Sequence, residues 1–146
     1  MENDWIKMSY SEIEELLGKY SKKVDGERWN PETNVRYDKL IKLNDKLRLF
    51  EGINSEYFRL VGSQKERAEY LIKQINFNEV CGRCSSEQII VMICYFVKYE
   101  YNKRYRRNYC RKAFKDYKVT TDMLDGFLLF LVEYTINNNI SNKNIV

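Results

Sequence analysis

An apolar run that follows a helix-capping signal near the middle of the chain constrains the fold more than any other feature. Ser85 is followed three residues later by Gln88, which is the spacing of a capping box. Residues 89 to 97 include no charged side chain, so a helix here has no polar face to turn toward water. An interior strand would also accommodate such a run, but the cap and the continuation to Tyr101 favour a helix. The sequence therefore predicts a helix that is buried on all sides.

Two helices are predicted upstream of this run. Residues 4 to 23 hold overlapping capping boxes followed by apolar residues at helical spacing, as in an amphipathic helix. A second helix starts at Asn30 and Pro31, a cap residue followed by proline at the first helical position. We expect it to end at Gly52, because glycine often terminates helices, and we expect a short helical turn within residues 53 to 61.

A third helix is expected from residue 63 to residue 76, opened by a capping box of Ser63 and Glu66. Its apolar residues fall on one face, which we expect to enter the core. The opposite face is expected to be solvated and comprises Lys65, Arg67, Glu69 and Lys73. A loop from 76 to 84 then leads to the central helix.

Two further helices are predicted after the central one. Residues 105 to 117 are expected to form a basic helix, and residues 121 to 134 an apolar closing helix. Thr120 or Thr121 caps the closing helix, which carries acidic residues near its positive end. The remaining residues, 137 to 146, are polar and rich in asparagine, and we expect them to fray.

These elements predict an all-α fold. No stretch alternates apolar and polar residues over strand length, and short connections favour a compact orthogonal bundle of five to six helices around the central apolar one. We expect an N-terminal helix and connection at 1–36, a helical domain at 37–136 and a flexible tail at 137–146. One core is expected to contain Ile89, Ile93, Cys94, Phe96, Leu124, Phe127, Leu128 and Leu131.

The sequence shows no sign of membrane insertion or secretion. Charged residues make up 32% of it, and no apolar stretch reaches the ~18 residues that a membrane span needs. Its start lacks the basic and apolar parts of a signal peptide. We therefore expect a soluble protein that does not associate with membranes and is cytoplasmic, or nuclear if its source is a eukaryote.

The residues needed for most enzyme chemistry are missing. The chain has no histidine, which removes the usual general base near neutral pH and the usual partner of a nucleophilic Ser or Cys. It has no Gly-rich phosphate loop. Its carboxylates are scattered, and the adjacent Glu14 and Glu15 fit a helix surface better than an acid and base pair. We expect a protein that is not an enzyme and has no cofactor.

Cys81 and Cys84 form a Cys-x-x-Cys pair just ahead of the central helix. Such a pair is typical of redox sites at a helix N-terminus and of half a zinc knuckle. A thioredoxin-like site needs a proline near the pair, whereas the one proline here is Pro31. A zinc site would need the two other thiols, Cys94 and Cys110, which fall inside predicted helices. We expect no bound metal, and a pair that is either reduced or joined in a local disulfide.

Positive charge is concentrated in one stretch. Between residues 98 and 118 nine basic side chains accompany only two acidic ones, a local charge of +7. Basic residues at spacings of three and four would form a row on one helix face, as proteins use to neutralise phosphates. Tyrosines are interleaved, and the alternative is that their rings cover the core while basic stems extend over them. The candidate nucleic-acid-binding residues are Lys103, Arg104, Arg106, Arg107, Arg111, Lys112, Lys115 and Lys118.

The order of these elements resembles a known family. The stretch Gly82-Arg83-Cys84-Ser85-Ser86-Glu87-Gln88-Ile89-Ile90 opens the apolar helix, and a basic helix, Val119-Thr120-Thr121 and a closing helix follow. This arrangement resembles a cyclin-box repeat of the transcription factor IIB type over about residues 38 to 136. The resemblance implies five helices, of which the last two form a helix-turn-helix that contacts promoter DNA. Residues 121 to 134 carry no Arg or Lys, so we do not extend base reading to that helix.

Two functions are open at this point. The first is a small, transcription-associated helical protein that binds nucleic acid, with duplex DNA favoured, through phosphate contacts of the basic helix. The second is a protein-interaction module without nucleic acid, in which the apolar closing helix docks on a partner or on a second copy of the chain.

Overall fold

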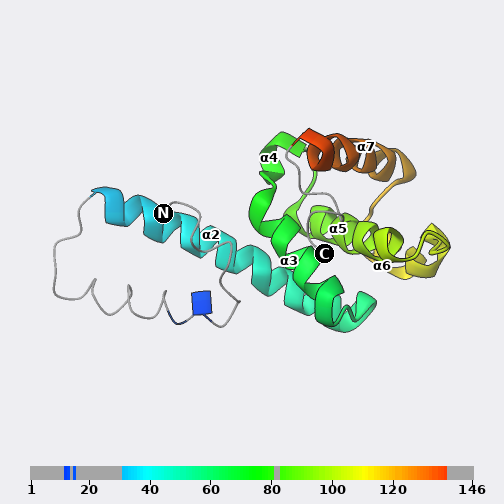
Figure 1. Cartoon of the computed structure of the whole chain (residues 1–146), viewed down its shortest axis with the longest axis horizontal. Helices are drawn as coiled ribbons and strands as arrows, with labels where there is room; N and C mark the ends of the chain where they lie inside the picture. The colour runs from blue at the N-terminus through cyan, green and yellow to red at the C-terminus, as the bar shows by residue number, and fades with distance from the viewer. Residues whose placement is uncertain (1–11, 14, 16–30, 81–82, 138–146) are drawn as a thin grey trace. The chain divides into compact units, whose positions relative to one another are not determined.

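The computed structural model describes residues 12, 13, 15, 31–80 and 83–137 (Figure 1). This part of the chain folds into six α-helices, a π-helical turn and a 3₁₀ turn. No strand occurs among these residues, so the predicted all-α class is confirmed. The chain forms two compact units, Met1–Leu49 and Phe50–Val146.

The first long helix, α2 (Pro31–Ile53), begins at the proline that the sequence indicates. It passes through Gly52, so the predicted stop there is wrong. Gly52 does not adopt a positive φ, and the helix continues directly into a π-helical turn, η2 (Asn54–Phe58). The helical path ends at Arg59, whose φ of 54° is left-handed.

Only three residues of the predicted amphipathic helix at 4–23 lie among the described ones. Glu12, Ile13 and Glu15 are helical, and Ile13 is buried. The rest of that prediction falls outside the described residues. In α2 the buried apolar residues of the first unit are Leu40, Leu43 and Leu47.

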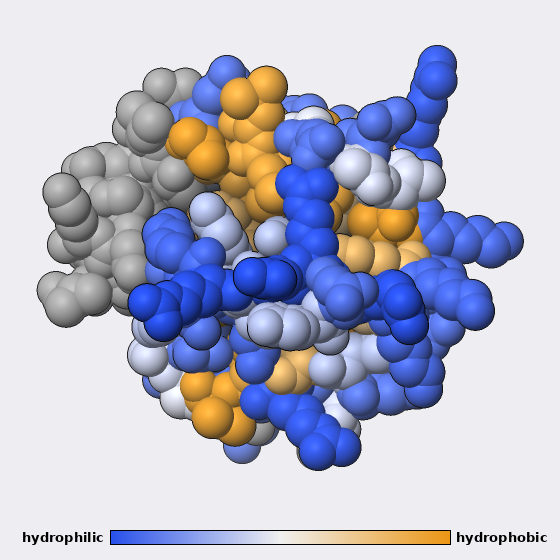
Figure 2. Space-filling model, turned by 90° about the vertical axis from the view of Figure 1, so that its right-hand side faces the viewer, coloured by the Kyte–Doolittle hydropathy of each residue, from blue (hydrophilic) through white to orange (hydrophobic). Residues whose placement is uncertain are grey.

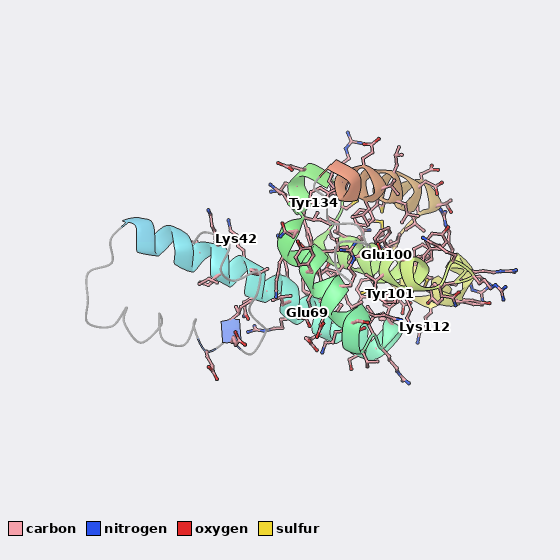
Figure 3. The ribbon with its side chains drawn as sticks, viewed as in Figure 1. Lys42, Glu69, Glu100, Tyr101, Lys112 and Tyr134 are labelled. Carbon is pink, nitrogen blue, oxygen red and sulfur yellow. The ribbon has the colours of Figure 1, made fainter. Side chains whose placement is uncertain are left out.

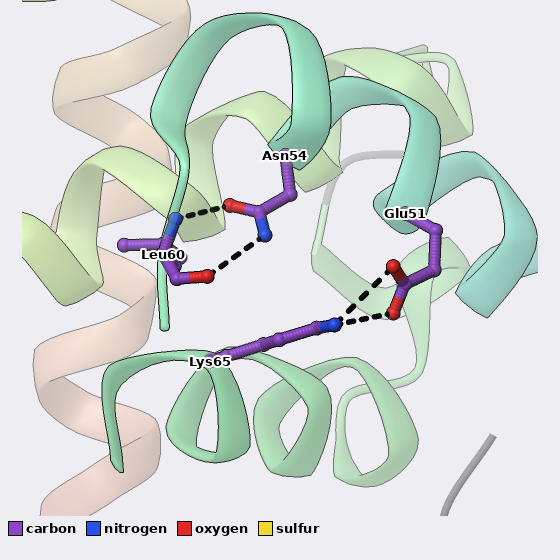
Figure 4. A network of polar contacts seen from close by, with 4 residues as sticks. All are labelled: Glu51, Asn54, Leu60 and Lys65. Atoms are coloured by element: carbon purple, nitrogen blue, oxygen red, sulfur yellow. Dashed lines mark hydrogen bonds and ion pairs between the residues drawn. The ribbon is translucent and has the colours of Figure 1, made fainter. Parts of the chain in front are cut away.

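A buried amide holds the connection after η2 (Figure 4). The Asn54 Nδ2 donates to the Leu60 carbonyl at 3.1 Å, and the Asn54 Oδ1 accepts from the Leu60 N–H at 2.7 Å. The Asn54 side chain thus pairs with both the N–H and the C=O of Leu60, a residue that lies outside any helix. Lys65 and Glu51 form an ion pair of 3.0 Å in the same region.

The next helix, α3 (Gly62–Gln74), starts without a side-chain cap, so the predicted capping box of Ser63 and Glu66 is wrong. Because Gly62 is already part of the helix, Ser63 lies too far into it to act as the cap. Arg67, predicted to be solvated, is only 2% exposed, because α3 packs against α5 (Ser86–Tyr101). The expected loop at 76–84 includes a short helix, α4 (Phe77–Val80).

The central helix α5 is capped as predicted. The Ser85 Oγ accepts from the Gln88 N–H at 3.2 Å, and the Gln88 Oε1 accepts from the Ser85 N–H at 3.0 Å. All nine residues from 89 to 97 are buried. The capping box and the burial of the apolar run on all sides are confirmed, whereas Tyr99 and Tyr101 in the last turn of this helix are exposed.

The closing helix, α7 (Thr121–Asn137), packs against α5 and completes the core. Its cap is Thr120, whose Oγ1 accepts from the Met123 N–H at 3.2 Å. Leu128 is half-buried beside the buried stripe of this helix, so its assignment to the core was only partly right. The predicted core residues found buried are Ile89, Ile93, Cys94, Phe96, Leu124, Phe127 and Leu131.

None of the helices described is both long enough and apolar enough to cross a membrane.

Candidate nucleic-acid interface

We call residues 103–118 the basic segment. It is not the single helix that we predicted from 105 to 117. It consists of a turn, a 3₁₀ helix η3 (Arg107–Cys110) and a six-residue helix α6 (Arg111–Asp116). It ends at Lys118, whose φ of 58° is left-handed. Because a 3₁₀ helix has three residues per turn instead of 3.6, the expected single row of cations is broken.

Asn102 explains why the helix does not form. Its backbone carbonyl accepts from the Tyr105 N–H at 2.9 Å, and its Oδ1 accepts from the Arg104 N–H at 3.1 Å. An asparagine side chain that satisfies a nearby backbone N–H competes with helical hydrogen bonding and favours a turn. The backbone therefore leaves α5 in a turn, and regular α-helix resumes only at Arg111.

Most of the predicted contact residues are exposed. Arg107 is half-buried, and the exposed ones are Lys103, Arg104, Arg106, Arg111, Lys112, Lys115 and Lys118. Within the described part of the chain none of these seven takes part in an ion pair. Figure 2 shows a largely hydrophilic face with extended side chains, and Figure 3 shows Lys112 at the outer edge near α6. The basic segment therefore presents its charge to solvent.

Arg107 has a different role from the other basic residues. Its Nη2 donates to the Asp125 Oδ1 at 2.6 Å and so joins η3 to α7. The hydrogen bond to the Asp125 carboxylate raises the pKa of Arg107. Arg107 was predicted to contact phosphates with the other basic residues, but an acidic residue of the closing helix pairs with its head.

The two acidic residues between positions 98 and 118 interact with residues outside the basic segment. Glu100 accepts from the Nε and Nη2 of Arg67 at 3.0 and 3.1 Å, where α5 meets α3 (Figure 3). The Asp116 Oδ2 accepts from the Tyr57 hydroxyl at 2.6 Å. Neither carboxylate forms an ion pair with a described side chain of the basic segment. The local positive charge is therefore not neutralised by direct pairing with these two acids.

The end of the basic segment is fixed to the start of α5. The Gln88 Nε2 donates to the backbone carbonyls of Tyr117 and Lys118 at 3.0 and 3.2 Å. The Tyr57 ring meets the Tyr117 ring edge to face, with centroids 5.6 Å apart. Gln88 thus serves both the helix cap and the segment, and the backbone that carries the cations is held in place.

Four aromatic rings form a continuous series that we call the tyrosine ladder. The ring centroids of Tyr99 and Tyr95 are 6.2 Å apart, those of Tyr95 and Tyr105 5.9 Å, and those of Tyr105 and Tyr109 5.4 Å. Tyr95 is 4% exposed, whereas the end members Tyr99 and Tyr109 are 38% and 66% exposed. Tyr95 is therefore buried in the core, and the rings at both ends of the ladder are exposed to solvent.

Cations lie over two rings of this ladder. The Lys103 Nζ is 4.7 Å from the Tyr99 ring centroid, and the Lys98 Nζ is 5.8 Å from that of Tyr105. These distances are within the range of cation–π attraction. The alternative interpretation, in which tyrosine rings cover the core, holds for the inner rings, whereas the outer rings are exposed.

The cysteines do not build a metal centre in the described part of the chain, where no three potential ligands come together. Cys94 and Cys110 are free and buried, and burial raises the pKa of the Cys110 thiol to about 11. Cys84 is disulfide-bonded, and Cys81 lies outside the described residues. Buried neutral thiols of this kind are poor metal ligands and poor nucleophiles.

The closing helix exposes two large apolar side chains among those that the structure describes. These are Leu129 and Val132, at 63% and 49%. Acidic residues share the exposed side of α7 with them, namely Asp122, Asp125 and Glu133. Because α7 packs against α5, much of its apolar surface is already covered, and docking of a partner on the rest stays a prediction.

Sequence reasoning missed the residues that position the basic segment. Asp125 was expected only to complement the positive end of a helix, and Gln88 only to complete a cap. Their other partners are 18 and about 30 residues away, and helical spacing carries no signal for such pairs. No family model, curated protein or solved structure matches this chain. The resemblance to a cyclin-box repeat therefore stays a prediction.

Proposed function

We propose that the protein binds nucleic acid by its phosphates, through the basic segment. The observation that carries this proposal is the exposure of seven cations that form no ion pair within the described part of the chain. Like charges held close together at a surface repel one another and retain counterions. Cations of the protein that neutralise phosphates release the counterions condensed on the nucleic acid, which favours binding.

The cations divide into two groups by the backbone that carries them. Arg111 and Lys115 are four residues apart on α6 and so share a helix face, where they can contact neighbouring phosphates. Arg104 and Arg106 extend from the turn before η3. Arg107 positions the segment through Asp125 and is not assigned a phosphate contact.

Anchoring of the segment supports the proposal. Gln88 and the bond between Tyr57 and Asp116 fix its C-terminal end, so its backbone does not need to become ordered on binding. Preorganisation of this kind reduces the entropic cost of association. A transcription-associated role rests on the cyclin-box resemblance alone.

Charge reversal on α6 tests the proposal. Arg111→Glu with Lys115→Glu removes two exposed cations and takes the formal net charge from +4 to zero. Lys39→Glu with Lys42→Glu on α2 makes the same change in net charge at two exposed residues outside the segment. Binding of a labelled oligonucleotide is measured over a range of salt concentrations, and circular dichroism checks that both variants are folded.

We expect the α6 variant to lose affinity and the α2 variant to keep it. The slope of log affinity against log salt should become shallower by roughly 0.7 to 0.9 for each phosphate contact removed. Equal losses in both variants would mean that only net charge matters. No binding by the parent at low salt would refute the proposed function.

A second candidate function is docking of a partner, or of another copy of the chain, on α7. The observation that favours it is the exposure of Leu129 and Val132 on one side of this helix. A mass that rises with protein concentration, and stays at that of the monomer in Leu129→Asp, would support this alternative. A monomer at all concentrations would leave no support for self-association.

A further inference from the structure

We infer that the bound nucleic acid is single-stranded and that its bases stack on the exposed ends of the tyrosine ladder, above all on Tyr109. This inference rests on the proposed function and adds the class of ligand to it. It comes from the aromatic rings, whereas the proposed function comes from the cations.

Tyr109 is an exposed ring that its neighbours hold in place. It is 66% exposed, more than the other exposed tyrosines of the described chain, Tyr99 and Tyr101 at 38% each. Tyr105 packs against it edge to face, with ring centroids 5.4 Å apart, and Tyr105 is itself half-buried. A ring that is both positioned and open to solvent can receive a base without first losing conformational freedom.

Cations accompany both exposed ends of the ladder. Arg106 and Arg111 are exposed and lie three residues before and two residues after Tyr109. At the other end the Lys103 Nζ lies 4.7 Å from the centre of the Tyr99 ring. A stacked nucleotide brings a phosphate on each side of its base, so a ring with basic neighbours matches the chemistry of an unpaired strand.

The helices of this region are poorly suited to reading a duplex. α6 has six residues, which corresponds to a length of about 9 Å. α7 is longer but carries no Arg or Lys, and base edges in the major groove are read mainly by such donors. The faces of paired bases are hidden inside the duplex stack, whereas a single strand offers them to Tyr109.

The test separates stacking from charge with four labelled probes of equal length. These are a thymidine oligonucleotide, the same backbone with abasic sites in place of its bases, a uridine oligonucleotide, and a duplex. Binding is measured by fluorescence anisotropy for the parent, Tyr109→Ala and Tyr109→Phe. The phenylalanine variant is the matched control, because it keeps the aromatic face and loses only the hydroxyl.

We expect the parent to bind the thymidine or the uridine oligonucleotide more tightly than the abasic strand and the duplex. Tyr109→Ala should weaken binding of that oligonucleotide by about 5- to 150-fold, the range for loss of one stacked base. It should leave both the abasic affinity and the salt dependence unchanged, while Tyr109→Phe behaves as the parent. The preferred sugar then identifies the strand as DNA or RNA.

Failure of this inference is distinguishable from failure of the proposed function. Equal binding of thymidine, uridine and abasic strands, or tighter binding of the duplex, would overturn stacking. If stacking were overturned in this way but Arg111→Glu with Lys115→Glu abolished binding of the same probes, the proposed function would stand. Retention of none of the four probes by the parent at low salt would overturn both.

Discussion

Glu100→Gln should lower the free energy of unfolding by about 3–5 kcal/mol, because it breaks a buried ion pair and leaves one charge behind. The Arg67 side chain is fully buried and that of Glu100 is 11% exposed. The carboxylate receives two hydrogen bonds from the guanidinium, at 3.0 and 3.1 Å. Glutamine preserves the size of the side chain but removes its charge and presents an NH₂ group where an acceptor is needed.

The chain supplies a matched control for burial. Lys65 and Glu51 also approach to 3.0 Å, but each side chain is 35% exposed. Solvent screens this pair, so Glu51→Gln should cost only about 0–1 kcal/mol. Both substitutions replace Glu by Gln in pairs with the same closest distance, whereas burial and the cation, Arg67 or Lys65, differ, so we attribute a larger cost at Glu100 mainly to burial.

A double variant completes the test. The Arg67 Nη1 is buried without a hydrogen-bond partner among the described residues, so the pair is incompletely compensated. Arg67→Met with Glu100→Leu should therefore be close to the parent in stability, as apolar replacements of buried ion pairs often are. Urea unfolding followed by circular dichroism gives the free energies. The reasoning is refuted if Glu100→Gln costs no more than Glu51→Gln, or if the double variant is less stable than Glu100→Gln.

Two further predictions concern other buried groups. Asn54→Ala should cost about 1–3 kcal/mol in the same urea assay, since it leaves both backbone groups of Leu60 without their partners, and a cost below that of Glu51→Gln would contradict this. Burial raises the pKa of Cys110 from 9.0 to about 11, so its contribution to stability should be constant below about pH 9 and fall from there to about pH 11, because the unfolded thiol ionises first. The melting temperature of the parent relative to Cys110→Ala should fall over that interval, and a relative rise would show that the sign is wrong.

The parts of the fold that could be predicted from the sequence are those set by local signals. Ser85 and Gln88 are three residues apart, and both hydrogen bonds of the cap lie within that short spacing. Helix ends depended on context. Gly52 remained helical because a glycine permits a left-handed turn without requiring one, and the turn occurred at Arg59.

The candidate site could be predicted only in its composition. Clustered charge indicated an exposed basic surface, and seven of the eight predicted residues are exposed. The partners of Arg107 and Arg67 could not be predicted. Each pair joins two different helical segments, and their sequence separation does not follow from the periodicity of a helix. Asn102 could have indicated the break in the basic helix, because asparagine after a helix often forms a turn with the backbone.

The charges of α7 limit the path that a bound strand can take. Asp122, Asp125 and Glu133 are exposed on this helix, which has no basic residue, so its solvent side repels phosphates. The pair between Arg107 and Asp125 marks the boundary between this acidic surface and the basic segment. On the proposed function, we expect a strand held by α6 to avoid the acidic side of α7 and to reach the exposed ring of Tyr109. The proposed function therefore predicts that the acidic residues of α7 exclude phosphates from one side of the basic segment, and this helix has no Arg or Lys with which to read bases.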